Sequence, residues 1–264
     1  MDMNNNSNNF SFLQKYQLLQ HSIMYDELID LGFTVIGYSK TDPSTFWNNA
    51  LINQVLNDEE IKQIEERFKL LDRRPTLYFE HGIKLKELTE KLELKQYKKG
   101  FEDCWQFWQG KEIDQTHFNS IKKVTTSEEL ETFLEVFNNC YQKDDPQNPY
   151  GELGDYLKAA RNVWNKHHVA NRIEYFMVYK DSKPVSVSTL TNYKEIGYIS
   201  NVGSLREVRG QGFGKAATLY CVSKSIKNGN IEHCLATEEG HYPNVFYQKI
   251  GFARRFVAVG YIKT

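Results

Sequence analysis

The sequence predicts an α+β fold: a mixed, mostly antiparallel sheet flanked by helices, preceded by a smaller α/β N-terminal domain. Segments 173–180 and 185–190 alternate apolar and polar residues around the turn 181–183, as the two strands of a hairpin do. Segments with apolar residues at helical spacing lie before and after this hairpin, so helices and strands share one domain. A chain of 264 residues can hold two small domains, and we expect them at residues 1–115 and 116–264.

The second domain is expected to begin with a short strand at 121–124, followed by two helices. Thr126 caps the first helix, and an acidic first turn follows it, as is typical of a helix start. The apolar residues of this helix are Leu130, Phe133, Leu134, Val136 and Phe137. The Asp- and Pro-rich residues 144–149 interrupt the chain, and the second helix is expected over 152–166.

After the hairpin, a third strand at 198–204 leads through a glycine-rich segment into another helix, which ends at 228–230. The apolar face of this helix is expected to consist of Ala216, Leu219, Val222 and Ile226. A strand at 234–237, a short helix around Tyr247 and a final strand at 255–262 complete the order β–α–α–β–β–β–α–β–α–β.

The first 115 residues are less regular, and the polar residues 1–9 are expected to form a frayed tail. Asn57 stands directly before an amphipathic segment, where a helix cap belongs. The elements expected in this domain are strands at 33–38, 75–79 and 97–108, and helices at 58–71 and 85–92.

Composition argues against several classes of protein. Lys and Arg number 33 against 34 Asp and Glu, so no basic field for nucleic acid is expected. No apolar run approaches the ~20 residues of a membrane span, and the N-terminus lacks the basic start and apolar centre of a signal peptide. The widely spaced cysteines are expected to be buried, reduced thiols of a cytoplasmic protein. They are Cys104, Cys140, Cys221 and Cys234.

The most specific signal is the glycine-rich segment between the third strand and the helix that follows it. Three glycines alternate along it, at Gly210, Gly212 and Gly214. Glycine permits positive φ and close approach of a ligand, while the free N–H groups at a helix N-terminus attract phosphate. Arg209 and Lys215 add positive charge at either end. The segment therefore predicts a cradle for a pyrophosphate.

Spacing excludes two familiar phosphate loops. A mononucleotide loop needs four residues between its first glycine and Gly-Lys, and then Ser or Thr. Here three residues separate Gly210 from Gly214, and Ala216 offers no hydroxyl for magnesium. The dinucleotide fingerprint needs its third glycine at a wider spacing.

The segment from Arg209 to Gly214 fits the pattern Arg/Gln-x-x-Gly-x-Gly/Ala, and so resembles the acyl-CoA loop of the GCN5-related N-acetyltransferase (GNAT) family. Downstream, Tyr247 to Phe252 is similar to the family signature Tyr-x-x-x-Gly-Phe. Gly251 and Phe252 also suit a helix end and the apolar contact that follows it. The resemblance covers residues 118–264, and the predicted order of elements matches the fold of this family.

The first domain is similar to the back half of a GNAT domain, as in tandem proteins of the family. It contains no comparable glycine loop, so the resemblance implies no acyl-CoA site there. Its expected role is to support the second domain and to shape the acceptor cleft. An unrelated α+β cap is the alternative.

The resemblance implies an acetyl-CoA-dependent N-acetyltransferase that transfers an acetyl group to a primary amine by direct attack. The pantetheine arm would lie along the third strand, with the phosphates on the glycine loop. The expected acetyl-CoA-binding residues are Val202, Gly203, Ser204, Arg209, Gly210, Gln211, Gly212, Phe213, Gly214, Lys215 and Asn244. Asn244 would hydrogen-bond the pantetheine arm, although a helix N-cap beside Pro243 suits it equally.

Tyr247 occupies the position of the family's catalytic acid, which protonates the departing CoA thiolate; a phenol of pKa ~10 is well matched to a thiol. A packing role is the alternative. The general base is left open. Its candidates, which we expect to be solvated surface groups, are Glu174, Glu238, Glu239 and His241.

The acceptor is expected to be a small-molecule or peptide amine, and the sequence leaves its identity and the acyl chain preference open. A homodimer is compatible with the resemblance. Nucleic acid, membrane and metal are not expected as partners, because the chain shows no motif with metal-ligand spacing. The competing function is a non-catalytic acyl-CoA-binding sensor or scaffold with the same fold.

Overall fold

The computed structural model describes residues 5–148 and 151–264, with residues 5–8 described by their backbone alone. The chain divides into two compact units. The first unit comprises the residues up to Trp105 together with Arg255–Thr264, and the second comprises Gln106–Arg254. Most of the last strand therefore packs as part of the first unit, although the sequence did not indicate this. That residues 1–115 and 116–264 form separate domains stays a prediction.

The first unit contains a sheet with the strand order β1-β2-β3-β4-β11-β5. All the pairings given for it are antiparallel except that of β3 with β4, which is parallel. Its elements are α1 (Asn5–Gln20), β1 (Glu27–Asp30), β2 (Val35–Tyr38), β3 (Asn49–Leu51), α2 (Asp58–Leu70), β4 (Thr76–Glu80), η1 (Ile83–Leu85) and α3 (Lys86–Leu94), with parts of β5 (Tyr97–Trp108) and β11 (Phe252–Lys263).

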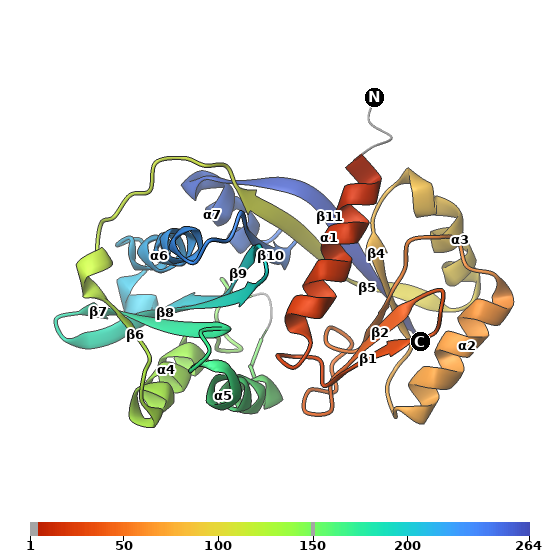
Figure 1. Cartoon of the computed structure of the whole chain (residues 1–264), viewed down its shortest axis with the longest axis horizontal. Coiled ribbons are helices and arrows are strands. Elements are labelled where there is room, and N and C mark those ends of the chain that lie inside the picture. Colours follow the sequence, from red (N-terminus) through yellow and green to blue (C-terminus); the bar gives the residue numbers. More distant parts are fainter. Residues whose placement is uncertain (1–4, 149–150) are drawn as a thin grey trace. The chain divides into compact units, whose positions relative to one another are not determined.

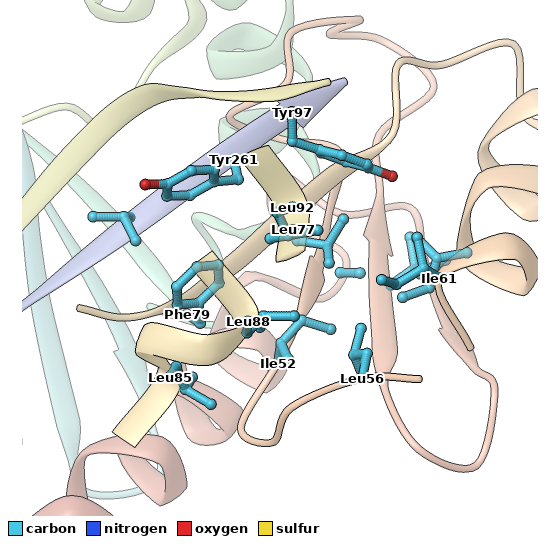
Figure 2. Close-up of a cluster of buried hydrophobic side chains, with 14 of the residues drawn as sticks. Ile52, Leu56, Ile61, Leu77, Phe79, Leu85, Leu88, Leu92, Tyr97 and Tyr261 are labelled. Atoms are coloured by element: carbon cyan, nitrogen blue, oxygen red, sulfur yellow. The ribbon is translucent and has the colours of Figure 1, made fainter. Parts of the chain in front are cut away.

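Helices α2 and α3 provide much of the hydrophobic core of this unit. Figure 2 shows Leu88 and Leu92 of α3 beside Leu77 and Phe79 of β4, all of them buried. The predicted Asn57 cap is confirmed, because its side chain accepts a hydrogen bond from the Glu60 N–H while the Glu60 carboxylate accepts one from the Asn57 N–H. Such a reciprocal capping box specifies where a helix begins.

One α-helix and two strands of the first unit were missed from the sequence: α1, β1 and β3. Strands of three or four residues are too short to show an alternating pattern. Residues 1–4 of the expected frayed tail lie outside the described residues, and from Asn5 onward that expectation is wrong, because the chain is helical. Tertiary contacts account for this helix in a polar, Asn-rich sequence: Phe12 packs edge-on against Trp105, and Leu13 is buried.

The second unit contains a sheet in the order β10-β9-β8-β7-β6. The β6, β7, β8 and β9 pairs are antiparallel and β9 runs parallel to β10, which confirms the predicted mixed, mostly antiparallel sheet. Its elements are η2 (Phe118–Ser120), β6 (Ile121–Lys123), α4 (Ser127–Cys140), α5 (Asp155–His167), β7 (Ile173–Lys180), β8 (Lys183–Tyr193), β9 (Ile196–Ser204), η3 (Arg206–Val208), α6 (Phe213–Lys227), β10 (Glu232–Glu238) and α7 (Tyr242–Ile250).

Helices cover both faces of this second sheet, α6 on one face and α4 with α5 on the other (Figure 1). Successive residues of β7 show the two faces: the Tyr175 ring stacks on Phe133 of α4, whereas Phe176 contacts Tyr220 of α6. The Thr126 cap of α4 is confirmed as a capping box with Glu129. Burial on both faces explains why these strands are almost continuously buried.

The predicted apolar face of α6 is wrong at Ile226, whose side chain is exposed. The buried face of the helix instead includes Ala217, Cys221 and Ser225, spaced four residues apart. Ser225 meets β9 at Gly197, where a Cβ atom would lie 1.8 Å from the serine Oγ. A small polar residue therefore occupies a core position that hydrophobicity alone assigns to the surface.

Two irregularities of β9 shape the functional end of this sheet. The pairing of β9 with β10 covers Ile196–Tyr198 and Glu232–Cys234, so the later part of β9 lies beyond it. The register against β8 also shifts near Asn201, which has a positive φ of 53°. These two features are those of a β-bulge, which bends the strand and changes the direction of its backbone.

All four cysteines are buried thiols, as predicted. Among the described residues, no helix is both long enough and apolar enough to cross a membrane.

Candidate functional site

A pocket of about 370 Å³ opens in the second unit, beside the end of β9. It brings together the last residues of β9, the glycine-rich loop, the first turn of α6 and one side of α7. The expected binding residues that line it are Val202, Gly203, Ser204, Arg209, Gly210, Gly212, Phe213, Gly214 and Lys215, together with the expected acid Tyr247. Gln211 belongs to the same loop but is not part of the lining.

The three glycines of the loop serve two different structural needs. Gly210 and Gly212 have φ angles of 79° and 89°, in the left-handed region that L-residues with a side chain rarely adopt. Gly214 has an ordinary conformation, but a Cβ atom there would lie 3.0 Å from the Ser204 Oγ of β9. The first two glycines therefore allow the turn, and the third lets the helix approach the strand.

The first turn of α6 presents unpaired backbone donors to this pocket. Gly212 is the N-cap residue and has no side chain with which to cap the helix. The N–H groups of Phe213, Gly214 and Lys215 have no partner within the helix, because the first turn has no preceding carbonyl oxygens. Together with the positive end of the helix dipole, they make this end of the pocket favourable for an anion.

Arg209, at the start of the loop, is held by a buried carboxylate. Its Nη1 and Nη2 groups donate to the two carboxylate oxygens of Asp145, and the distance from Nη1 to Oδ1 is 2.8 Å. Its Nε donates to the carbonyl oxygen of Ser204 over 3.2 Å. These hydrogen bonds from Arg209 lower the pKa of Asp145 to about 2. Asp145 lies in the connection from α4 to α5, so this ion pair joins that connection to the glycine loop.

Lys215, at the other end of the loop, has an exposed partner. Its Nζ lies 2.8 Å from the Asp114 carboxylate. The bonds that Asp114 accepts from Lys215 and Thr116 hold its pKa well below the usual value. Asp114 lies in the connection from β5 to β6, and His117 of the same connection stacks on Phe213 with ring centroids 4.6 Å apart.

Tyr247 lies on the second turn of α7, with a buried ring that lines the pocket. The ring makes edge contacts with Phe246 and Phe252. Gly251 ends the helix with a φ of 121°, and a Cβ atom there would lie 2.6 Å from the ring of Trp108. The Gly-Phe pair is therefore required by packing at the point where α7 turns into β11.

Asn244 is the one expected binding residue that the structure places away from both the pocket and its loop. His241 is the N-cap of α7, so Asn244 is not the cap that the sequence also allowed. The Asn244 side chain is buried, and its Oδ1 accepts a hydrogen bond from Gln248 over 3.0 Å. Its Nδ2 has no hydrogen-bond partner among the described residues.

Side chains already bond the backbone carbonyl oxygens of β9 along the pocket. Val202 accepts from the Tyr141 hydroxyl over 2.9 Å, and Gly203 accepts from the Ser186 hydroxyl over 2.6 Å. Tyr141 itself lines the pocket. These contacts hold the strand end in place beyond its pairing with β10.

The general-base candidates are all engaged outside the pocket. Glu174 was expected to be solvated, but it is fully buried and paired with Lys123 over 3.0 Å. Glu239 pairs with Arg254 over 3.1 Å, and Glu238 lies 3.8 Å from His241. None of the four candidates is among the residues that line the pocket.

The sequence also missed several residues of the site, namely Cys140, Tyr141, Asp145 and, beside the loop, Asp114 and His117. Residues 144–149 looked only like a chain break, because no local pattern indicates that a loop carboxylate becomes buried. Burial raises the pKa of the Cys140 thiol to about 12, so the thiol stays protonated at neutral pH.

The charged side chains along the pocket, as far as the structure describes it, are all basic: Arg209, Lys215 and Lys249. Within residues 5–148 and 151–264, no group of three or more His, Cys, Asp or Glu side chains has the arrangement of a metal site. The pocket therefore combines backbone donors with positive charge, a combination that suits a phosphorylated ligand.

Comparison with known proteins shows the fold of the chain. The structure is similar to a GCN5-related N-acetyltransferase from Kribbella flavida, with a TM-score of 0.64, 15% identity, and coverage of 95% of this chain and 94% of that one. A functionally unknown conserved protein from Staphylococcus epidermidis gives a TM-score of 0.64 and 16% identity, over 91% and 94% of the two chains.

A tandem GNAT protein from the clavulanic acid biosynthesis pathway has a TM-score of 0.54 and 11% identity, covering 87% of this chain and 77% of that one. No curated protein matches the sequence. Residues 130–252 match the model of the acetyltransferase (GNAT) family, a span that includes β9, the glycine loop and α7. The sequence match and the shared fold together place this domain, residues 130–252, in the GNAT family of acetyltransferases.

Proposed function

We propose that the second unit is an acetyl-CoA-dependent N-acetyltransferase that acylates a primary amine. One observation carries the proposal: the glycine loop at the N-terminus of α6, the end of β9 beyond its pairing with β10, and Tyr247 all line one pocket. Acyl transfer from acyl-CoA would use all three: the loop to bind the phosphates, the strand to bind the pantetheine arm, and the tyrosine to donate a proton.

The diphosphate of acetyl-CoA would bind at the glycine loop. Its negative charge suits the free N–H groups of α6 and the basic residues Lys215 and Lys249. Arg209 is assigned a structural role in the loop, because its guanidinium already donates hydrogen bonds to Asp145 and to the Ser204 carbonyl oxygen. We assign the remaining loop residues Gly210, Gln211 and Phe213, with Gly212 and Gly214, to the same phosphate cradle.

The pantetheine arm would follow β9 at Val202, Gly203 and Ser204, beyond the pairing of this strand with β10. Carbonyl oxygens have two lone pairs, so those that already accept from side chains can accept from the arm as well. The bulge near Asn201 interrupts the regular pairing of this strand with β8, and we assign a backbone N–H of this part of the strand to the thioester carbonyl oxygen. A donor in that place stabilises the oxyanion of the tetrahedral intermediate.

In the reaction, the neutral amine attacks the thioester carbonyl carbon, and the carbon–sulfur bond breaks as the intermediate collapses. Tyr247 gives its phenolic proton to the departing thiolate. Water takes up the proton lost by the amine nitrogen and returns a proton to the Tyr247 phenolate, so that no proton is gained or lost over the cycle. The products are an amide and CoA. No carboxylate of the described pocket is in a position to act as general base, so water is assigned that role here.

A non-catalytic acyl-CoA-binding module is the second candidate. The observation in its favour is that the Tyr247 ring is buried between Phe246 and Phe252, as a packing residue would be. Both candidates bind acetyl-CoA, and only the enzyme releases CoA when an amine is present.

The decisive experiment combines calorimetry with an assay for free CoA thiol. Acetyl-CoA is titrated into the protein, and a panel of small-molecule and peptide amines is then tested for thiol release. One binding site per chain is expected, because the sequence before residue 116 contains no second glycine loop. Binding without release over the whole panel favours the sensor, and absence of binding overturns both candidates.

A further inference from the structure

The connection from β5 to β6 passes over the glycine loop. In Figure 1 it runs from β5 past α6 before reaching β6. Besides the ion pair of Asp114 with Lys215, the His117 ring covers Phe213 and its Nε2 lies 3.3 Å from the carbonyl oxygen of Gln211. Three contacts, made by two residues, thus join this connection to the residues expected to hold the ligand's phosphates.

Asp114 is held in a defined orientation. One carboxylate oxygen accepts from the N–H and hydroxyl of Thr116, over 2.9 and 2.6 Å. The other oxygen faces the Lys215 Nζ over 2.8 Å. This places a carboxylate against the side chain of Lys215, the third residue of α6. Lys215 lies at the end of the pocket to which we assign the phosphates.

We propose that Asp114 is an exchangeable counter-ion of Lys215, which a phosphate group of the ligand displaces from the lysine ammonium on binding. This inference rests on the proposed function, because acetyl-CoA supplies the phosphate. The exchange makes Asp114 an affinity-determining residue: its carboxylate competes for Lys215 and repels an anion bound at the loop.

Exposure is what allows this exchange. The Asp114 and Lys215 side chains are both partly exposed, so either can meet water or another ion when the pair separates. Exposed ion pairs contribute little and separate readily, since water screens them. Asp145 is different, because its buried carboxylate would have to lose its partner without gaining water.

The opposite possibility is that Asp114 orients Lys215 toward the ligand and thereby strengthens binding. The two roles predict opposite signs for the same substitution. Asp114→Asn keeps the shape and the bonds from Thr116 but removes the charge. Exchange predicts tighter binding, whereas orientation predicts weaker binding. A variant that folds poorly cannot imitate a gain in affinity.

The experiment titrates CoA into wild type, Asp114→Asn and the matched control Asp155→Asn at low ionic strength. Asp155 forms an exposed ion pair with Lys158 on α5 and is not part of the pocket lining. Asp114→Asn is expected to tighten CoA binding by about two- to fivefold, the size of an exposed ion pair, and Asp155→Asn to leave it unchanged. Unchanged or weaker binding by Asp114→Asn overturns the proposal.

Two further measurements distinguish a failure of the Asp114 exchange from a failure of the proposed acetyl-CoA function. In a Lys215→Met background, the gain from Asp114→Asn is expected to shrink, and a full gain there would show that Lys215 is not involved. Inorganic pyrophosphate is titrated as a second probe. Tighter pyrophosphate binding by Asp114→Asn with no binding of CoA would support the exchange and overturn the acetyl-CoA assignment. If Asp114→Asn tightens the binding of neither CoA nor pyrophosphate, the exchange itself is overturned.

Discussion

The two ends of the glycine loop each carry a basic residue paired with an aspartate, and the two pairs differ in burial. At the start of the loop, Arg209 is 23% exposed and Asp145 only 1%. At its end, Lys215 and Asp114 are 41% and 45% exposed. The difference shows that the burial of the counter-ion decides whether a loop cation supports the fold or remains accessible to a ligand.

The physical reason is the cost of leaving a charge without a partner. A buried carboxylate that loses its cation cannot gain water in exchange, so the pair stays closed. An exposed pair separates at little cost, because water solvates both ions. Arg209 is therefore a structural clamp between the α4–α5 connection and the loop, and Lys215 is the cation that can reach a ligand.

The largest effect on acetyl-CoA binding is expected at Gly212, which lies between the two ends. Gly212→Glu adds a side chain and a negative charge to a residue with positive φ beside the phosphate cradle. We expect it to weaken acetyl-CoA binding by about 100-fold or more, since like charges in contact repel by several kcal/mol. Calorimetry measures the loss.

The matched control for this prediction is Gly229→Glu, which carries the same charge and the same backbone strain at the other end of α6. It is expected to bind acetyl-CoA normally. Unchanged affinity in Gly212→Glu would show that the loop is not part of the acetyl-CoA site. The comparison of its two ends would then have no bearing on ligand binding.

Tyr247→Phe tests whether catalysis can be separated from the loop. Removal of the phenolic proton is expected to lower kcat by about 10²–10⁴-fold and to leave acetyl-CoA affinity nearly unchanged, because the ring and its packing remain. Steady-state kinetics with a saturating acceptor checks this. Tyr242→Phe, at an exposed tyrosine of the same pocket, is the control. If the loss appears in that variant instead, Tyr242 is the acid and Tyr247 only packs.

Matched substitutions at the two ends of the loop test the comparison directly. Arg209→Met leaves the buried Asp145 carboxylate with Arg206, at 3.4 Å, as its remaining cation, and is expected to cost about 2–3 kcal/mol of unfolding free energy. Lys215→Met is expected to leave stability close to that of wild type and to weaken CoA binding. Urea denaturation and calorimetry measure the two effects. Equal losses of stability would show that the two pairs do not differ as their burial indicates.

The smallest effect is a dependence of stability on pH. Asp145 has a lowered pKa of about 2 in the folded chain, against ~3.9 when unfolded. Its pairing therefore contributes fully above about pH 4 and is lost as the pH falls toward 2. The difference in unfolding free energy between wild type and Arg209→Met should shrink over that interval. A difference that stays constant from pH 5 to about pH 2 would mean that the carboxylate charge is not what stabilises the clamp.

Local patterns sufficed for several elements of both units. The capping residues Asn57 and Thr126 marked the starts of α2 and α4, because capping involves only neighbours along the chain. Alternation predicted the β7–β8 hairpin for the same reason. Patterns failed where a distant partner decides the outcome, as at α1, which depends on contacts such as that of Phe12 with Trp105, and at Ile226, whose expected core position is taken by Ser225.

The sequence by itself determined the glycine loop, the helix that follows it and the Tyr247 signature, because glycine conformations, helix ends and residue spacing are local properties. Only the tertiary structure decided which charges of the loop are paired with a buried carboxylate and which stay exposed. Asp145 lies far from Arg209 in the sequence, and Asp114 farther still from Lys215. No local pattern distinguishes a loop aspartate that becomes buried from one that stays in water, since burial depends on what the rest of the fold packs over it.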